Sequence, residues 1–455
     1  MSRKNEIDML HGSIADKILL FALPLAASSV LQQLFNSADV AVVGRFSGSD
    51  ALAAVGSTGP VIGLLVNLFV GLSIGANVTA AKYLGQENNE GVQRTVHTSV
   101  LLALISGIIL LIVGQIAVRP ILVVMSTPED VLPLSMKYMR IYFLGMPFIM
   151  LYNFGSALLR SIGDTKRPLA ALTIAGVINV ILNLVFVVGF GMSVDGVAIA
   201  TVCSNIVSSG LVTFFLCREK SAVHLNLKEL KIHKRVLKEV AGIGIPAGVQ
   251  GIVFSVSNIC IQGTLNTFGS VVMAGSSAAL NFEYYTFFVI SAFGQTCTTF
   301  VSQNMGAGNL RRCKSVVVRA AAMAVAGVAV MSAVFIIFDK EFLSIFTTEP
   351  EVMQYGIIRM HAILGFQVFN VMIEVFSGAL RGMGHSTIPA GIAILGVCGV
   401  RLLYVFLIFD YLGTLESLFA IYPISWGIAA TAIITAFIIT YRKKRKEELQ
   451  TAQAV

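Results

Sequence analysis

Acidic side chains inside long apolar stretches are the residues of this chain that are best placed to do chemistry. Asp39, Glu283 and Glu374 each lie within a stretch long enough to cross a lipid bilayer. An ionisable group is costly in hydrocarbon, and where it occurs it commonly binds an ion, relays a proton or contacts a substrate. The three acids are therefore predicted to bind a cation or a proton inside the membrane.

The depth of each acid follows from its position along its helix. Counted from Lys17, Asp39 lies about 33 Å along a straight helix, in the outer part of the membrane. Glu283 lies about 18 Å and Glu374 about 10 Å from the nearer end of its stretch, which places both near the middle. The competing interpretations are a cap at the helix end for Asp39 and an ion pair with a basic neighbour such as Arg401 for the other two acids.

Two amide side chains accompany the first acid. Asn179 and Asn183 are four residues apart in the fifth apolar stretch and therefore share one face of a helix. Hydrogen bonding between neighbouring helices explains such a pair as well as a functional site does.

Polar and aromatic residues in the same stretches are candidates for contact with a substrate. Tyr284 directly follows Glu283 in a run that ends with Phe287 and Phe288, and aromatic faces attract organic cations by about 0.5–2 kcal/mol. Packing against other helices or lipid is the more common role of such rings. The predicted cavity residues are Gln33, Asn36, Asn258, Gln262 and Tyr284.

Membrane helices must position these residues. The chain of 455 residues is 56% hydrophobic and only 12% charged, whereas a soluble domain carries about 25% charged residues. A helix crosses the hydrocarbon core in about 20 residues. The stretches of this length are 18–44, 53–81, 96–118, 138–158, 168–190, 194–217, 238–265, 271–302, 315–338, 357–380, 388–409 and 418–441. The predicted fold is an all-α integral membrane protein with twelve transmembrane helices in two pseudo-symmetric six-helix bundles.

The basic residues predict the orientation of these helices. Most of the 32 Lys and Arg residues lie in alternate connecting segments, including the central segment Arg218 to Lys238 and the run Arg442 to Lys446. Cytoplasmic segments of membrane proteins are enriched in these residues. Both termini and the central segment are therefore predicted to be cytosolic, in a multi-pass protein of a bacterial-type plasma membrane. This distribution accounts for the net charge of +8 without a nucleic-acid partner.

An internal repeat divides the chain into two similar halves. Leu159 to Pro168 (LRSIGDTKRP) recurs as Leu380 to Pro389 (LRGMGHSTIP), 221 positions later. Such duplication builds transporters from two related bundles. The predicted parts are an N-terminal six-helix lobe (1–217), a cytosolic linker (218–237), a C-terminal six-helix lobe (238–441) and a basic cytosolic tail (442–455). A short helix on the membrane surface and a solvated strap explain the linker equally well.

Four motifs carry a family likeness. They are NSADVAVVGRFSG at Asn36 to Gly48, LRSIGDTKRP from Leu159, VSQNMGAGN at Val301 to Asn309, and LRGMG from Leu380. In this order and spacing they resemble the multidrug and toxic compound extrusion (MATE) family of antiporters, over about residues 14–441. The resemblance implies two six-helix lobes around a central cavity. It also implies export of organic, often cationic, compounds in exchange for inward-moving H⁺ or Na⁺.

The resemblance also implies roles for individual residues. Asp39 falls on the acid of the family's A-D-x-x-x-V-G motif, which is a cation or proton site there. Asn179 and Asn183 follow the family's N-x-x-x-[DN] pattern, but members with Asp at the second position have a carboxylate pair that this chain lacks. The family's acids in the second lobe lie in its seventh, eighth or tenth helix, and the register of Glu374 relative to them stays open. H⁺ and Na⁺ both stay open as the coupling ion.

Other function classes fit the sequence less well. The chain has no G-x-x-x-x-G-K-[ST] motif for ATP-driven export and no His-rich or acid-rich cluster for a membrane enzyme, so neither an enzyme nor a metal or other cofactor is predicted. A flippase for lipids or lipid-linked oligosaccharides, which shares the doubled architecture, is the main alternative, and a cavity lined by arginines would favour it. A passive channel is the third candidate. The predicted partners are small organic substrates and membrane lipid, and the duplicated lobes predict a functional monomer.

Overall fold

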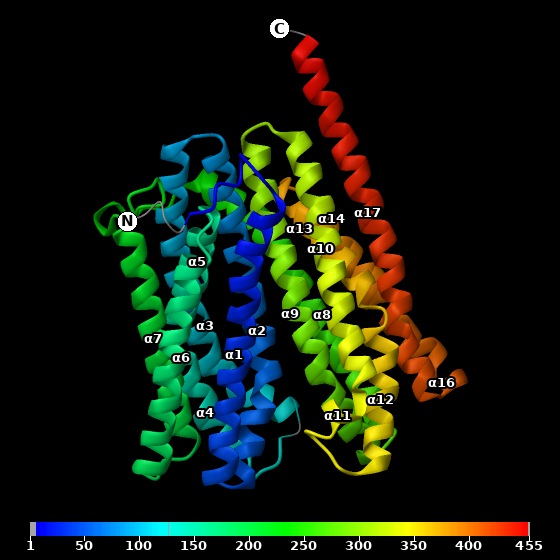
Figure 1. The fold of residues 1–455 in the computed structure, drawn as a ribbon. Helices are drawn as coiled ribbons and strands as arrows, with labels where there is room; N and C mark the ends of the chain where they lie inside the picture. Colours follow the sequence, from blue (N-terminus) through cyan, green and yellow to red (C-terminus); the bar gives the residue numbers. More distant parts are fainter. Residues whose placement is uncertain (1–5, 126, 454–455) are drawn as a thin grey trace. The chain divides into compact units, whose positions relative to one another are not determined.

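The computed structural model describes residues 6–125 and 127–453, and all regular secondary structure in these residues is helical. Helices satisfy their own backbone hydrogen bonds, which hydrocarbon cannot do for them. The first half forms α1 (Ala15–Phe46), α2 (Ser49–Gly85), α3 (Asn89–Val124), α4 (Leu132–Leu144), α5 (Met146–Ser161), α6 (Lys166–Asn183), η2 (Leu184–Gly189) and α7 (Val194–Cys217). Figure 1 shows these helices running side by side as a bundle.

The second half repeats this order. It forms η3 (Leu227–Glu229), α8 (Lys234–Asn266), α9 (Ser270–Gly306), α10 (Leu310–Ile337), α11 (Asp339–Leu343), α12 (Pro350–Leu364), α13 (Gln367–Gly382), α14 (Thr387–Ala393), η4 (Ile394–Gly399), α15 (Val400–Leu403), η5 (Tyr404–Ile408), α16 (Phe409–Leu412) and α17 (Leu415–Gln453). η2, η4 and η5 are π-helical turns: η2 ends α6, and η4 and η5 lie on the two sides of α15.

The prediction of twelve membrane helices is confirmed. Among the described residues, nine helices have the length and hydropathy of a membrane span, and the bent pairs α4–α5 and α12–α13 raise this number to eleven. The twelfth is α9, whose 37 residues are long enough to cross a membrane but include several polar side chains, Glu283 among them. The search for long apolar stretches in the sequence therefore also found α9, although the hydropathy of this helix is modest.

The two bent segments break at glycines. α4 and α5 meet at Gly145 with an angle of 49°, and Pro147 lies in the first turn of α5. α12 and α13 meet after Gly365 with an angle of 44°. Proline lacks a backbone N–H and its ring clashes with the preceding turn, so it begins a helix more readily than it continues one. The chain bends beside Pro147, whereas α1 continues through Pro24 and α8 through Pro246.

The internal repeat is present in the backbone as well as in the sequence. Gly163 and Gly384, which follow α5 and α13, both adopt left-handed conformations, with φ of 88° and 87°. Glycine adopts such angles readily because it has no Cβ. Asn88 and Asn309 cap α3 and α10 in the same way, each side chain accepting a hydrogen bond from a backbone N–H three residues further on. The duplicated motifs thus begin and end helices at equivalent places in both halves.

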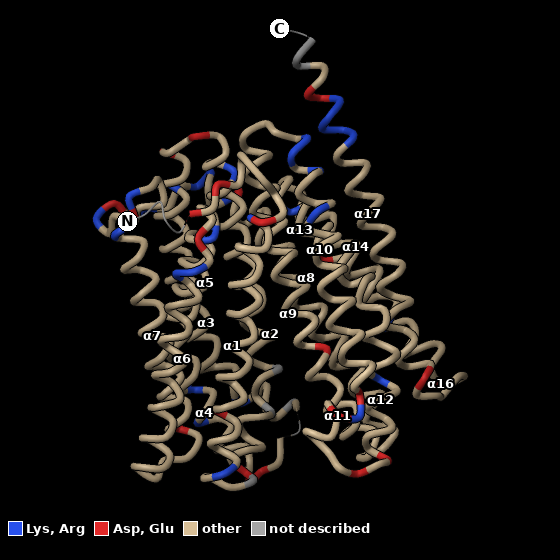
Figure 2. The backbone as a smooth tube through the Cα atoms, viewed as in Figure 1, with Lys and Arg blue, Asp and Glu red and all other residues tan. Residues whose placement is uncertain are grey.

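The chain divides into two compact units. The first unit comprises Met1–Asp8 and Ala27–Gly248, and the second comprises Met9–Ala26 and Val249–Val455. The predicted lobe boundaries at 217 and 238 were drawn from hydropathy and charge, and they stay a prediction. In each unit, charged residues are scarce along the middle of the helices and gather near their ends, as Figure 2 shows. This distribution fits a band of hydrocarbon around the middle of each bundle.

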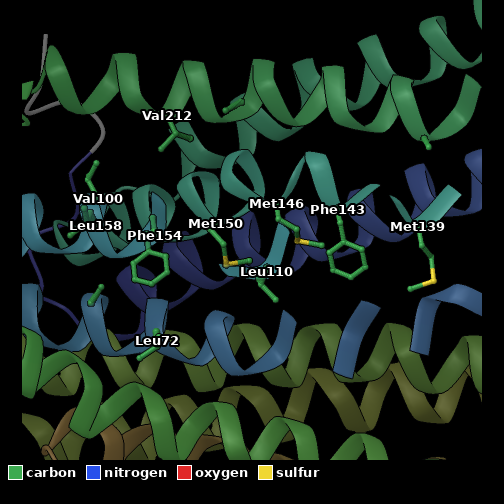
Figure 3. Packing of buried hydrophobic residues seen from close by; sticks show 14 of the residues in the cluster. Leu72, Val100, Leu110, Met139, Phe143, Met146, Met150, Phe154, Leu158 and Val212 are labelled. Atoms are coloured by element: carbon green, nitrogen blue, oxygen red, sulfur yellow. The ribbon is translucent and has the colours of Figure 1, made fainter. Parts of the chain in front are cut away.

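Large apolar side chains fill the core of the first unit. Phe143, Met146, Met150 and Phe154 are fully buried and follow one another along α4 and α5 (Figure 3). Gly114 of α3 makes room for this row, because a Cβ at Gly114 would lie 2.2 Å from the ring of Phe143. Small residues of this kind let membrane helices pack closely. The bend between α4 and α5 is therefore held by packing on both sides of Gly145.

Glycines also bring α9 and α13 together in the second unit. A Cβ at Gly378 would lie 2.4 Å from the carbonyl oxygen of Gly294, and a Cβ at Gly382 would lie 2.7 Å from the carbonyl oxygen of Thr298. Because lipid tails are as apolar as helix surfaces, association in a membrane depends on such close van der Waals packing.

The linker between α7 and α8 is neither a surface helix nor a fully solvated strap. It contains the single 3₁₀ turn Leu227–Glu229, and its Leu225 is buried against the first unit. Glu219 accepts hydrogen bonds from Arg167 at 2.5 Å and from the backbone N–H of Lys220 at 2.8 Å. Burial raises the pKa of Glu219, but these hydrogen bonds outweigh burial and hold the pKa below its ordinary value. These contacts anchor the first part of the linker to the first unit.

The predicted basic tail continues the last helix. α17 extends beyond the other helices of the second unit (Figure 1) and carries the run Arg442 to Lys446 on this extension. The tail is thus helical as far as Gln453. Its cytosolic location stays a prediction.

Gly378→Ala is expected to destabilise the second unit. Its Cβ would collide with the backbone of α9, and overpacking of this kind costs about 1–3 kcal/mol. Thermal unfolding of the purified protein in detergent, followed by circular dichroism, measures the effect. Gly391→Ala in α14 is the matched control, because a Cβ there would meet no heavy atom within 4 Å. Equal melting temperatures for the two variants would contradict the close approach of α9 and α13.

Candidate functional site

The first unit holds a buried carboxylate on α1. Asp39 is only 6% exposed and lies two turns before the end of its helix, so it is not a helix cap. Its Oδ1 accepts a hydrogen bond from Nδ2 of Asn183 at 2.5 Å, and its Oδ2 lies 3.2 Å from the hydroxyl of Thr201. Nδ2 of Asn183 also donates to Oδ1 of Asn179 at 3.3 Å. We call Asp39, Asn179, Asn183 and Thr201 the Asp39 cluster.

Three of these four residues were predicted together from the sequence. Thr201 of α7 was not, because threonine is common in apolar helices and nothing nearby in the sequence marks it. The signal that could have found it is its place in the sixth apolar stretch, next in the chain to the helix that carries Asn179 and Asn183.

Two local features bring the helices of the Asp39 cluster into contact. A Cβ at Gly176 of α6 would lie 1.8 Å from the ring of Phe35, so only glycine lets α1 pack against α6 here. Directly after Asn183, α6 passes into the π-helical turn η2. Such turns are uncommon and often mark functional sites. The backbone around Asn183 therefore departs from regular helix where its side chain meets Asp39.

The Asp39 cluster presents oxygen atoms to a ligand. Oδ1 of Asn183 is buried and has no hydrogen-bond partner among the described residues. Rotation of the Asn183 amide would bring this oxygen together with the carboxylate of Asp39, Oδ1 of Asn179 and the hydroxyl of Thr201 in an all-oxygen set of the kind that hard cations prefer. No group of three or more His, Cys, Asp or Glu side chains that could hold a metal occurs in the part of the chain that the structure describes. The binding of a proton or a cation at this cluster stays a prediction.

The second unit holds a buried ion pair. Arg359 of α12 donates two hydrogen bonds to the carboxylate of Glu283 on α9, from Nε at 2.5 Å and from Nη2 at 3.0 Å. A third bond runs from Arg359 to the hydroxyl of Ser276 at 2.7 Å. The partner of Glu283 is thus Arg359 and not Arg401, because α12 packs directly against the face of α9 that carries Glu283. The charge of this acid is already matched within the unit.

Arg401 lies elsewhere in the second unit. It is 2% exposed and sits on the four-residue turn α15, between the π-helical turns η4 and η5. Its Nε donates to the hydroxyl of Ser425 at 3.2 Å, and its Nη1 donates to Oδ1 of Asn258 at 3.4 Å. Its guanidinium lies 4.1 Å from the ring centroid of Tyr422 and 5.7 Å from that of Trp426. Among the described residues, it forms no ion pair with a carboxylate.

The third predicted acid and the predicted aromatic contact lie apart from these groups. Glu374 is half-buried on α13, and within the described ranges it has no ion pair. Tyr284 is 43% exposed and stacks on Phe288, with ring centroids 6.4 Å apart. An exposed stacked ring remains available to a ligand or to lipid.

The four predicted amides are distributed over two helices. Gln33 is half-buried and Asn36 exposed, both on α1 of the first unit. On α8 of the second unit, Gln262 donates to Asn266 at 2.9 Å, while the exposed Asn258 contacts Arg401. Their role in a substrate cavity stays a prediction.

A cavity of about 440 Å³ opens in the second unit between α12, α13 and α17. Its lining is apolar except for one exposed acid and consists of Ile358, Ala362, Phe366, Phe369, Glu416, Ala420, Pro423 and Ile424. None of these residues was predicted to contact a substrate. The bend between α12 and α13 creates this space, and the sequence gives no direct sign of such a bend because no proline follows Gly365.

Known proteins share this sequence and this architecture. The MatE family profile matches residues 24–185 and 246–407, one match in each half of the repeat. The chain is 28% identical over 446 residues to the probable multidrug resistance protein YoeA of Bacillus subtilis, covering 95% of each chain. It is 26% identical over 403 residues to the probable multidrug resistance protein NorM of Thermotoga maritima, covering 88% of this chain and 86% of that one.

The fold is also that of a solved transporter structure. An outward-facing multidrug resistance MATE family transporter of the MOP superfamily superposes with a TM-score of 0.89 at 22% sequence identity. The match covers 98% of this chain and 100% of the solved one. The two-bundle architecture is therefore common to both proteins.

Glu283→Gln is expected to destabilise the protein strongly, because it leaves Arg359 buried without a counter-charge, which costs about 3–5 kcal/mol. The double variant Glu283→Gln/Arg359→Met should recover much of this loss, since it removes both charges. Melting temperatures in detergent measure both effects. A double variant that is no more stable than the single one would contradict a mainly electrostatic coupling of the two residues.

Proposed function

Because the chain belongs to the MatE family, whose members are membrane transporters and not enzymes, we propose that it exports organic, amphipathic cations in exchange for H⁺ or Na⁺. It is a multi-pass membrane protein and a secondary transporter related to multidrug efflux proteins. The buried Asp39 cluster is the observation that supports the coupling to an ion. A carboxylate that accepts hydrogen bonds from two neutral side chains within a membrane can exchange its charge with a small cation.

The proposed exchange works by competition for negative charge. An ion that enters from outside neutralises Asp39, whose carboxylate then no longer attracts a cationic substrate. For Na⁺, rotation of the Asn183 amide would turn its unpartnered Oδ1 toward the ion. For H⁺, the same oxygen would accept the hydrogen bond of the protonated carboxyl. Exchange of one monovalent cation for one ion moves no net charge, so the concentration gradient of the ion drives it. Each further ion that moves inward through 100 mV adds about 2.3 kcal/mol.

The site is proposed to face the two sides of the membrane in turn, by alternating access. The aromatic pair Tyr284 and Phe288 offers a stacked surface for the planar or apolar part of a substrate. The membrane that holds the protein is proposed to be the plasma membrane, with both termini on the cytosolic side. The protein is proposed to act as a monomer, because one chain contains both halves of the repeat.

Asp39→Asn is expected to abolish ion-driven uptake of ethidium into inside-out vesicles, to no more than about a tenth of wild type, because a neutral amide cannot exchange charge with an ion. A pH gradient and a Na⁺ gradient are imposed in separate experiments, and the gradient that drives ethidium uptake identifies the coupling ion. Asp410→Asn is the control, since this acid is exposed at the end of α16 and has no ion pair among the described residues.

Ethidium binding to Asp39→Asn in detergent, measured by fluorescence polarisation, tests the competition directly, and the melting temperature of the variant shows whether it folds. Competition at Asp39 requires that the folded variant binds ethidium more weakly than wild type does and that added H⁺ or Na⁺ no longer displaces the dye. Wild-type vesicles that show no uptake with either gradient but scramble fluorescent lipids would contradict drug export and favour the flippase.

Thr201→Val is expected to weaken ion coupling without abolishing it. The change removes one oxygen from the Asp39 cluster, and a lost hydrogen bond of about 1 kcal/mol corresponds to a roughly fivefold weaker site. Ethidium uptake measured over a range of driving-ion concentrations should show a several-fold higher half-saturating concentration and an unchanged maximum. Thr213→Val on the same helix is the control, because its hydroxyl bonds only to the carbonyl of Ser209. Identical curves for the two variants would exclude Thr201 from the ion site.

A further inference from the structure

We propose that the second unit contains an oxyanion site centred on Arg401, which receives the carboxylate of a zwitterionic or anionic organic substrate. The inference rests on the proposed export of organic compounds and extends it from simple cations to molecules that also carry a negative group.

The first support is the unmatched charge of Arg401. Its contacts in the described residues are neutral: the hydroxyl of Ser425, the amide oxygen of Asn258, and the rings of Tyr422 and Trp426. A buried cation normally pairs with an anion, because neutral contacts replace only part of the lost hydration. The side chain is thus held by weak partners and forms no ion pair with a carboxylate of the described residues.

The buried acid of the same unit cannot supply that counter-ion. Glu283 already accepts two hydrogen bonds from Arg359, so this pair is close to neutral. Glu374 is only half-buried and forms no ion pair in the part of the chain that the structure describes. The buried interior around Arg359 and Arg401 therefore carries two positive charges and one negative charge. One further anion would make it neutral.

The repeat places Arg401 where the first unit has its cation cluster. Arg401 aligns 221 positions after Val180, on the helix turn that carries Asn179 and Asn183 in the first unit, and Tyr422 aligns with Thr201 at the same offset. The Asp39 cluster is built on α1, α6 and α7, and the contacts of Arg401 come from their counterparts α8 and α17. Equivalent helices thus hold a carboxylate in one unit and a guanidinium in the other.

The backbone shares this correspondence. In the first unit the π-helical turn η2 begins directly after Asn183, and in the second unit η4 and η5 lie on both sides of the turn that carries Arg401. π-helical turns are rare and concentrate at functional sites. A structural arginine needs no irregular backbone on both sides of it.

Asn258 is the residue at which a ligand could reach Arg401 from the surface. Its side chain is exposed, while Arg401 behind it is buried. The bond between them, 3.4 Å long, is weak for a guanidinium, which forms bonds of about 2.7–2.9 Å with a carboxylate. An entering carboxylate can therefore replace Oδ1 of Asn258 with a stronger acceptor. The amide Nδ2 of Asn258 is then free to donate a second hydrogen bond to the same ligand.

The depth of Arg401 identifies the source of the oxyanion. Arg401 lies about 21 Å along the helix from Thr387 and about 16 Å from Leu412, near the middle of the span. Lipid phosphates lie at the two surfaces of the bilayer. The occupant is therefore the carboxylate of a substrate and not a lipid head group.

Rhodamine B and its ethyl ester test the proposal, because the dyes differ only in a carboxylate that the ester masks. Fluorescence polarisation with the purified full-length protein in detergent gives both dissociation constants. Wild type is expected to prefer rhodamine B. Arg401→Gln should weaken rhodamine B binding about 10–100-fold and leave ester binding within about twofold, since a buried charged hydrogen bond is lost for one ligand only. Arg319→Gln is the control, because this arginine of α10 is exposed.

Several results would overturn the proposal. Wild type without preference for rhodamine B, or equal losses for both dyes in Arg401→Gln, would make Arg401 a structural residue. Competition by phosphatidylglycerol that disappears in Arg401→Gln would assign the site to a lipid. If Arg401→Gln does not fold, Arg401→Lys keeps the positive charge but lacks the planar guanidinium group, and it should retain an intermediate preference for rhodamine B. The binding assay uses no ion gradient, so its outcome is independent of whether the protein couples export to H⁺ or Na⁺.

Discussion

The cost of holding a charge within hydrocarbon governs the interior of both units. An isolated ionised side chain is expensive there, so each buried charge needs a partner or a ligand. The first unit surrounds Asp39 with the neutral donors Asn183 and Thr201. The second unit matches Glu283 with Arg359 in a bidentate pair. These are different solutions, because neutral donors leave a carboxylate able to exchange its charge with an ion, whereas a bidentate guanidinium fixes it.

Close helix packing is what makes either solution possible. Side chains of this length meet only where backbones approach closely, and glycine permits this at Gly176 of α6 beside Phe35 of α1 and at Gly275 of α9 beside Val352 of α12. In lipid the same contacts also supply much of the helix association itself. The glycines that hold each bundle together therefore also set the distances within its polar clusters, so fold and site depend on the same few positions.

The sequence predicted what local patterns determine and missed what depends on contacts between distant helices. The twelve spans and the repeat follow from hydropathy and from direct comparison of the two halves. Asp39 and the two asparagines were recognisable because ionisable and amide side chains are rare in such stretches. The pairing of Glu283 with Arg359 was not, since 76 positions separate them and several arginines were available. Thr201 was missed because its role appears only when α7 lies against α1.

Duplication gives a physical reason why the two halves can diverge in charge. The same helices, with the same irregular turns, surround a carboxylate in the first unit and Arg401 in the second. A low-dielectric pocket strengthens the electrostatic interactions of any charge placed in it, whatever the sign of that charge. A change of a few side chains is then enough to reverse the charge of the ligand that a pocket attracts, while the backbone that positions it stays unchanged. A duplicated transporter can in this way bind an ion of one sign in one half and a substrate group of the other sign in the second.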